Sequence, residues 1–70
     1  MNRDRLEIQW TRRVGEGRRA FLRLKNGGRI LMSSSAYKGR SPAESYRSAK
    51  RAARNIQRRN PAMKVVDHIR

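Results

Sequence analysis

Cysteine is absent from this 70-residue chain, and histidine occurs only once, at His68. Without cysteine the chain can form no disulfide framework, and a single histidine is too few for the ligand spacing of a zinc finger. No apolar run approaches the roughly 20 residues that cross a bilayer. The N-terminal segment MNRDRLEIQW also lacks the apolar core of a signal peptide. We therefore expect a protein of the reducing cytoplasm that holds neither a metal ion nor a cofactor.

The short length limits what the chain can stabilise by itself. Residues 1–70 suffice for a single domain, and a domain of this size buries only a modest fraction of its surface on folding. Because disulfides and metal ions are excluded, association between copies is the remaining common source of stability. The sequence therefore predicts a homodimer.

Acidic residues are scarce: 5 Asp and Glu face 19 Lys and Arg, which gives a formal net charge of +14. Such a charge repels other copies of the chain and attracts polyanions, so nucleic acid, acidic lipid or an acidic protein are the candidate partners. Arginine supplies 15 of the 19 basic residues and pairs bidentately with phosphate and guanine, which favours nucleic acid. The arginine bias carries little weight alone, because a GC-rich genome produces it too.

Three segments have the alternation of half-buried strands, at about residues 5–12, 19–26 and 29–34. The first places Leu6, Ile8 and Trp10 on one face, and the third is expected to turn Ile30 and Met32 inward. The second strand has Ala20, Leu22 and Leu24 on one face and Arg19, Phe21, Arg23 and Lys25 on the other.

The links between these segments predict an antiparallel meander. Asn26-Gly27 is a strong hairpin signal between the second and third segments. Between the first two lies RRVGEGRR, which we interpret as a plain turn. A phosphate-cradling loop is the weaker reading, since no P-loop Lys-Ser/Thr follows.

A helix is predicted over about residues 42–59. Ser41 is the expected N-cap, with Pro42 at the first helical position and Glu44 placed to close a capping box, and Asn60-Pro61 ends the helix. The inward stripe is expected to be Ala43, Tyr46, Ala49, Ala53 and Ile56. A second face carries Arg47, Arg51, Arg54 and Arg58, flanked by Lys50 and Arg59.

The tail, about 63–69, fits either a short edge strand or an arm across a partner subunit. The predicted class is α+β: a three-stranded meander packed by one helix, with a possible fourth strand.

The run NGGRILMSSSAYKGRSPAESYRSAKRAARN, with its flanks, resembles the YegP-like domains, a small bacterial and archaeal family without an assigned function. The elements that carry the resemblance are Arg23-Leu24-Lys25, Asn26-Gly27, Ile30-Leu31, Ser33 to Ser35, Tyr37, the stretch Ala43 to Ala53, and Val66-Asp67. It covers about residues 6–67. The resemblance implies a β-β-β-α unit that occurs in tandem or as paired single repeats, which agrees with a homodimer. The arginine-rich loop at 12–19 and the basic helix face depart from the family pattern, and the family supplies no chemistry.

No catalytic arrangement is evident, so we expect no enzyme. His68 lies two residues from the C-terminus, a poor platform for a positioned base, and a surface histidine is the simpler interpretation. The serines at 33–35 have no nucleophile elbow and no evident partner base, so loop hydrogen bonding is the expected role.

Nucleic-acid binding is therefore the favoured function, mainly through phosphate contacts and with little sequence preference. A small sheet can enter the major groove, so DNA is favoured over RNA, and the protein would then associate with the nucleoid. Phe21 offers a base a stacking surface, although a dimer contact is the favoured role for so large an aromatic. The candidate binding residues are Arg12, Arg13, Arg18, Arg19, Arg23, Lys25, Arg47, Lys50, Arg51, Arg54 and Arg58.

The alternative is a protein-interaction module, such as a small phage or regulatory protein that docks its basic face on an acidic partner. A membrane surface is disfavoured, because the other face of the helix is rich in alanine and lacks the large apolar residues that interfacial helices insert. The sequence leaves open whether the helix face or the sheet face contacts the ligand.

Overall fold

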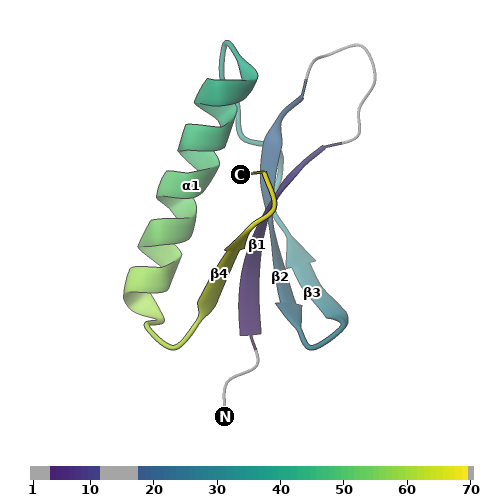
Figure 1. The fold of residues 1–70 in the computed structure, drawn as a ribbon, viewed down its shortest axis with the longest axis vertical. Helices are drawn as coiled ribbons and strands as arrows, with labels where there is room; N and C mark the ends of the chain where they lie inside the picture. Colours follow the sequence, from purple (N-terminus) through teal and green to yellow (C-terminus); the bar gives the residue numbers. More distant parts are fainter. Residues whose placement is uncertain (1–3, 12–17, 70) are drawn as a thin grey trace.

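The computed structural model describes residues 4–11 and 18–69. In chain order the elements are β1 (Asp4–Trp10), β2 (Ala20–Asn26), β3 (Arg29–Ser33), α1 (Pro42–Arg59) and β4 (Lys64–Asp67). The strands form one sheet in the order β3-β2-β1-β4, and α1 lies along one face of it (Figure 1). This confirms the predicted α+β class and the predicted limits of the helix.

Strands β1, β2 and β3 pair antiparallel as a meander, and β4 pairs parallel to β1. The tail is thus an edge strand of its own subunit, which decides between the two interpretations of residues 63–69. His68 extends the pairing, since its N–H donates to the Ile8 carbonyl at 3.0 Å. β1 ends at Trp10, and residue 12 of the predicted strand lies outside the described residues.

The β2–β3 hairpin turns between residues 26 and 29, where the predicted segments 19–26 and 29–34 placed it. Asn26 still belongs to β2, and Gly27 and Gly28 form the turn. Gly27 has φ of 60°, while Gly28 has no positive φ, which is the pattern of a turn that needs glycine at its first central position.

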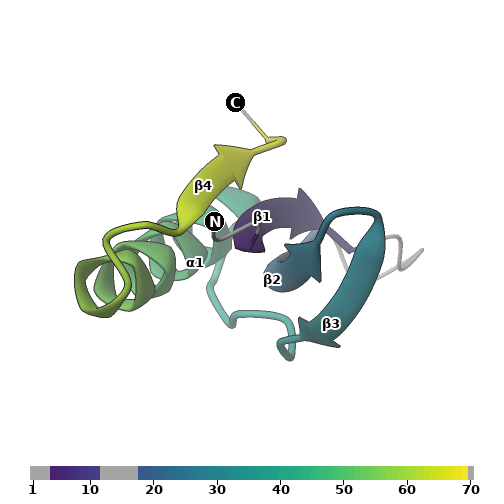
Figure 2. The same cartoon turned by 90° about the horizontal axis from the view of Figure 1, so that it is seen from below.

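The prediction that Ile30 and Met32 face inward is wrong, since they are 52% and 61% exposed. Two causes act together. The register shifts between β2 and β3, so that Met32 pairs with Leu24 but Ile30 pairs with Lys25, on the face opposite the helix. In addition, α1 contacts β2, β1 and β4 but not β3, so Met32 stays uncovered. Figure 2 shows β3 at the side of the sheet farthest from α1.

The core between α1 and the sheet is small. Its buried hydrophobic residues are Leu6, Ile8, Ala20, Leu22, Ala49, Ala53 and Met63. The alanines of α1 let the helix approach the sheet closely, as the small-residue stripe predicted. Their short side chains also limit the apolar area that the core removes from water.

The inward stripe of α1 begins at Ser45 and not at Ala43, which is exposed. Ser45 is fully buried, and its hydroxyl accepts from the Ala20 N–H at 2.8 Å and donates to the Tyr37 carbonyl at 2.6 Å. One side chain thus satisfies two backbone groups, the buried N–H of Ala20 and the part-buried carbonyl of Tyr37. It ties the first turns of α1 to the start of β2 and to the loop before the helix.

Local sequence signals explain why α1 begins where it does. Ser41 is the N-cap and its hydroxyl accepts from the Glu44 N–H at 3.2 Å, while the Glu44 carboxylate accepts from the Arg40 N–H at 2.7 Å. Glu44 therefore accepts a backbone hydrogen bond as predicted, but the donor is Arg40, one residue before the N-cap Ser41. Gly39 lies against this turn: a Cβ atom there would stand 2.7 Å from the Ser45 nitrogen.

Candidate nucleic-acid interface

The four predicted arginines of the helix stripe, Arg47, Arg51, Arg54 and Arg58, are all exposed on α1. Their spacing of four, three and four residues keeps them on one face of the helix. This face points away from the sheet, because the opposite face of α1 carries the buried Ala49 and Ala53. The stripe extends over about 16 Å along the helix axis, at 1.5 Å per residue.

In the described part of the chain, acidic side chains do not neutralise this stripe. Among the described residues, none of the four guanidinium groups has an ion pair with a carboxylate. Glu44 is engaged at the helix N-terminus, and Asp67 accepts a hydrogen bond from the Tyr46 hydroxyl. The cationic face is therefore uncompensated within the described part of the chain, and neighbouring arginines repel each other across successive turns.

Two further basic residues flank the stripe differently. Lys50 is half-buried, and its Nζ lies 5.7 Å from the centroid of the Tyr46 ring, a cation–π contact that holds the ammonium beside the sheet. Arg59 is exposed in the last turn of α1, where a cation is favoured by the helix dipole. Of the two, Arg59 has the freer access to a ligand, although Lys50 was the predicted binding residue.

The second predicted group lies on the opposite side of the molecule, on the face of the sheet that α1 does not cover. Because Ala20, Leu22 and Leu24 face the helix, Phe21, Arg23 and Lys25 of β2 point to this open face. Arg19 directly precedes β2 in the same alternation and is half-buried, while Arg18 beside it is exposed. Arg12 and Arg13 lie outside the described residues.

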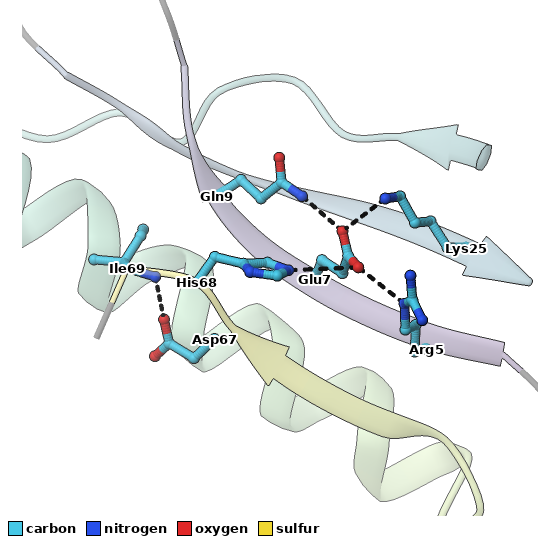
Figure 3. A network of polar contacts seen from close by, with 7 residues as sticks. All are labelled: Arg5, Glu7, Gln9, Lys25, Asp67, His68 and Ile69. Atoms are coloured by element: carbon cyan, nitrogen blue, oxygen red, sulfur yellow. Dashed lines mark hydrogen bonds and ion pairs between the residues drawn. The ribbon is translucent and has the colours of Figure 1, made fainter. Parts of the chain in front are cut away.

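Glu7 is the centre of the open face, and its side chain is only 3% exposed. Figure 3 shows its carboxylate surrounded by side chains from three strands or their ends. Arg5 Nε donates to Glu7 Oε2 at 2.9 Å, and Gln9 Nε2 donates to Oε1 at 2.6 Å. Lys25 Nζ lies 3.3 Å from Oε1, and His68 Nε2 lies 3.4 Å from Oε2.

This network sets the charge of Glu7. Burial by itself would raise the pKa of the Glu7 carboxyl, but hydrogen bonds from His68, Lys25 and Arg5 outweigh burial and hold the pKa below its ordinary value of 4.5. Glu7 is therefore ionised at neutral pH and neutralises part of the basic sheet face. Lys25 is committed to this network and is only 21% exposed.

Arg23 and Phe21 form a second contact on the open face. The Arg23 guanidinium carbon lies 5.2 Å from the centroid of the Phe21 ring, so the cation covers part of the aromatic face. The two side chains line a shallow hollow together with Gln9, Trp10, Thr11, Ser33, Ser34 and Ala36. Phe21 is half-buried within its own chain.

The predicted site thus separates into two surfaces. The helix face gathers exposed arginines that have no acidic partner among the described residues, whereas on the sheet face Lys25 contacts Glu7 and Arg23 contacts Phe21. Because the two surfaces point in opposite directions, one molecule cannot apply both to the same side of one ligand. Of the predicted binding residues, Arg47, Arg51, Arg54 and Arg58 are the ones that the structure gathers on one exposed basic surface.

Sequence reasoning missed the role of Arg5 and His68 as partners of Glu7. The contacts of Arg5 and Lys25 with Glu7 could have been predicted, because Arg5 lies two residues before Glu7 in the same strand and Lys25 lies in the neighbouring strand of the predicted meander. His68 gave no such signal, because only the parallel pairing of β4 with β1 brings it to Glu7.

Within residues 4–11 and 18–69, no three His, Asp or Glu side chains gather as a metal site. In the same part of the chain, no helix is long and apolar enough to span a membrane.

Models of protein families, curated proteins and solved structures were compared with this chain, and none matches it. The resemblance to the YegP-like domains stays a prediction.

Proposed function

We propose that this chain is a small DNA-binding protein that holds double-stranded DNA through phosphate contacts from the exposed face of α1. The observation that carries the proposal is the set of four exposed arginines on one helix face, none of them paired with a described carboxylate. Uncompensated cations on a rigid element are the electrostatic footprint of a phosphate-binding surface. The net charge of +14 adds long-range attraction for a polyanion.

The dimensions of the stripe agree with this ligand. A stripe of about 16 Å matches roughly five base pairs of duplex axis, since each strand carries one phosphate per 3.4 Å of that axis. Arginine suits this role because its planar group donates two parallel hydrogen bonds to phosphate oxygens. Such contacts carry no sequence information, so we propose similar affinity for unrelated sequences.

A competition experiment tests the ligand class. A labelled random duplex bound to the purified protein is challenged with unlabelled duplex, single-stranded DNA, tRNA and polyglutamate, and fluorescence anisotropy is recorded. The proposal expects duplex to compete best and polyglutamate to compete poorly. If tRNA or single-stranded DNA competes better than duplex, that nucleic acid and not duplex DNA is the ligand. If polyglutamate competes best, an acidic protein partner is favoured.

A further inference from the structure

The shallow hollow beside Phe21 and Arg23 lies on the open face of the sheet and has a volume of about 640 Å³. That volume is within the range of about 300–1,000 Å³ that is usual for small-ligand sites in proteins. Its lining combines an aromatic ring with polar side chains from β1, β2 and the end of β3. The arginine face of α1 lies on the opposite side of the molecule, so the proposed function makes no use of this hollow.

Arg23 brings a cation without an acidic partner to this hollow. It stands directly opposite Glu7 in the register of β1 and β2, but no carboxylate of the described residues forms an ion pair with it. The guanidinium lies over Phe21 instead, and its Nε is buried without a hydrogen-bond partner in the described part of the chain. A buried donor without an acceptor is unfavourable, so a ligand that brings acceptor oxygens to the guanidinium is favoured.

Two cations flank the Phe21 ring along the strand. Arg19 and Arg23 lie two residues before and after Phe21, and alternate residues of a strand share one face. The strand pairing reaches Arg19, since the Thr11 N–H donates to the Arg19 carbonyl at 2.7 Å. An aromatic ring between cations is a surface on which unpaired bases stack while the cations meet the phosphates. Duplex DNA does not fit this surface, because its bases are paired and stacked inside the double helix.

Gln9 adds a hydrogen-bond acceptor to the hollow. Its Nε2 donates to the ionised Glu7 carboxylate, which can only accept, so the orientation of the amide is fixed. The amide oxygen is therefore turned away from Glu7, as Figure 3 shows, and no described residue donates to it. Gln9 lines the hollow and pairs with Phe21 across β1 and β2. A base that stacks at Phe21 can thus donate an N–H of its pairing edge to this oxygen.

We propose that this hollow binds a nucleotide through its unpaired base and its phosphate. The base stacks on Phe21, and its pairing edge donates to the Gln9 oxygen. The phosphate accepts hydrogen bonds from Arg19 and Arg23. A carboxylate of an acidic protein would pair with the arginines but would not use the face of the aromatic ring. Free nucleotides and single-stranded nucleic acid both offer this chemistry. The proposal is independent of the proposed function, because it concerns the opposite face and a different ligand.

Isothermal titration calorimetry at about 150 mM salt, where distant charges are screened, tests this site. Each source of the nucleotide has a probe and a partner that lacks the base. AMP is compared with ribose 5-phosphate for a free nucleotide, and tetradeoxyadenylate with the abasic tetramer for a single strand. The proposal expects at least one base-containing probe to bind about tenfold or more tightly than its baseless partner. An advantage of AMP identifies a free nucleotide as the ligand, and an advantage of the tetramer alone identifies a single strand.

Variants assign this advantage to the hollow. Phe21→Leu keeps an apolar side chain in β2 and should abolish the difference between a probe and its baseless partner, whereas Arg23→Gln should weaken the binding of both. Arg40→Gln removes one charge from an exposed site after β3 and should change neither. Equal affinity for base-containing and baseless probes in the natural chain would overturn the proposal, and so would an undiminished difference in folded Phe21→Leu protein.

Nuclear magnetic resonance of the natural chain gives a second test that does not depend on the folding of a variant. Addition of the tighter probe should shift the backbone amide signals of Gln9, Phe21 and Arg23 more than those of Arg51 and Arg54. Larger shifts along α1 would overturn the proposal. The affinity for a random duplex depends on α1 and should be the same in Phe21→Leu, so a failure of either proposal can be distinguished from a failure of the other.

Discussion

The arginine face of α1 makes a quantitative prediction about the salt dependence of DNA binding. The perturbation is the double variant Arg51→Gln/Arg54→Gln, which removes two neighbouring cations from the middle of the stripe. Both side chains are exposed and have no carboxylate partner among the described residues, so their removal should leave the fold unchanged. Glutamine is also a good helix former, which limits the effect on α1 itself.

The size of the effect follows from the release of counterions by neutralised phosphates. Each phosphate contact contributes about −0.9 to the slope of log K against log salt. Loss of two contacts should therefore make the slope shallower by about 1.8, and at 0.1 M salt the same relation gives about a 60-fold weaker affinity. The assay is fluorescence anisotropy of a labelled random duplex at four or more salt concentrations.

A matched control distinguishes the effect of removing arginines from the helix face from the effect of lowering the net charge. The double variant Arg29→Gln/Arg40→Gln lowers the net charge by the same amount at two exposed sites outside α1. It should change the slope much less than the helix variant. Equal shifts of the slope in the two double variants would refute a specific role for the helix face, because binding would then depend on total charge.

Three further predictions concern the residues that position these surfaces. Glu7→Gln should lower the free energy of unfolding by about 1–3 kcal/mol at pH 7, since it removes the charged acceptor of a buried network. Because the folded-state pKa of Glu7 is lowered, its contribution is present above the ordinary value of 4.5 and is lost as the pH falls through the folded value. The natural chain should thus lose stability below about pH 5, and the variant should lose less. Ser45→Ala should cost about 1–3 kcal/mol in denaturant unfolding, because the buried Ala20 N–H and the part-buried Tyr37 carbonyl lose their partner. Gly39→Ala should lower the melting temperature, since the new methyl would meet the helix backbone at 2.7 Å.

Each of these variants has a control in the same chain. Ser48→Ala is the control for Ser45, because Ser48 is only half-buried on the same helix and should change stability little. Gly28→Ala is the control for Gly39, because a Cβ at Gly28 meets no atom within 4 Å. Equal losses for a variant and its control would show that the named contact is not the cause. For Glu7, an unchanged pH dependence in the variant would assign the acid sensitivity to another group.

Local signals were enough to predict β1, β2, β3 and α1 and their order, but they left residues 63–69 open between an edge strand and an arm. Ser41, Pro42 and Asn60-Pro61 define both ends of α1 within the sequence itself, because capping and proline geometry act over a few residues. Alternation in β1 and β2 likewise predicted which side chains face the helix, since a strand turns successive residues to opposite faces. The exposed arginine stripe followed from the same reasoning about helix periodicity.

The features that were missed depend on contacts distant in sequence. Glu7 is buried on the outer face because β4 returns beside β1 and brings His68 to it, and no pattern within residues 5–11 indicates that return. Ser45 looked like a polar helix residue, yet the backbone of β2 and of the preceding loop gives its hydroxyl two partners. Met32 follows the expected alternation but stays exposed, because the width of sheet that one helix covers is a tertiary property.

The central claim is that the exposed face of α1 binds DNA phosphates. The most direct measurement is the affinity of the natural chain for a random duplex as a function of salt concentration. Four contacts from the arginine stripe predict a slope of about −3.6. A slope shallower than about −1, or binding too weak to detect at 50 mM salt, would contradict the claim.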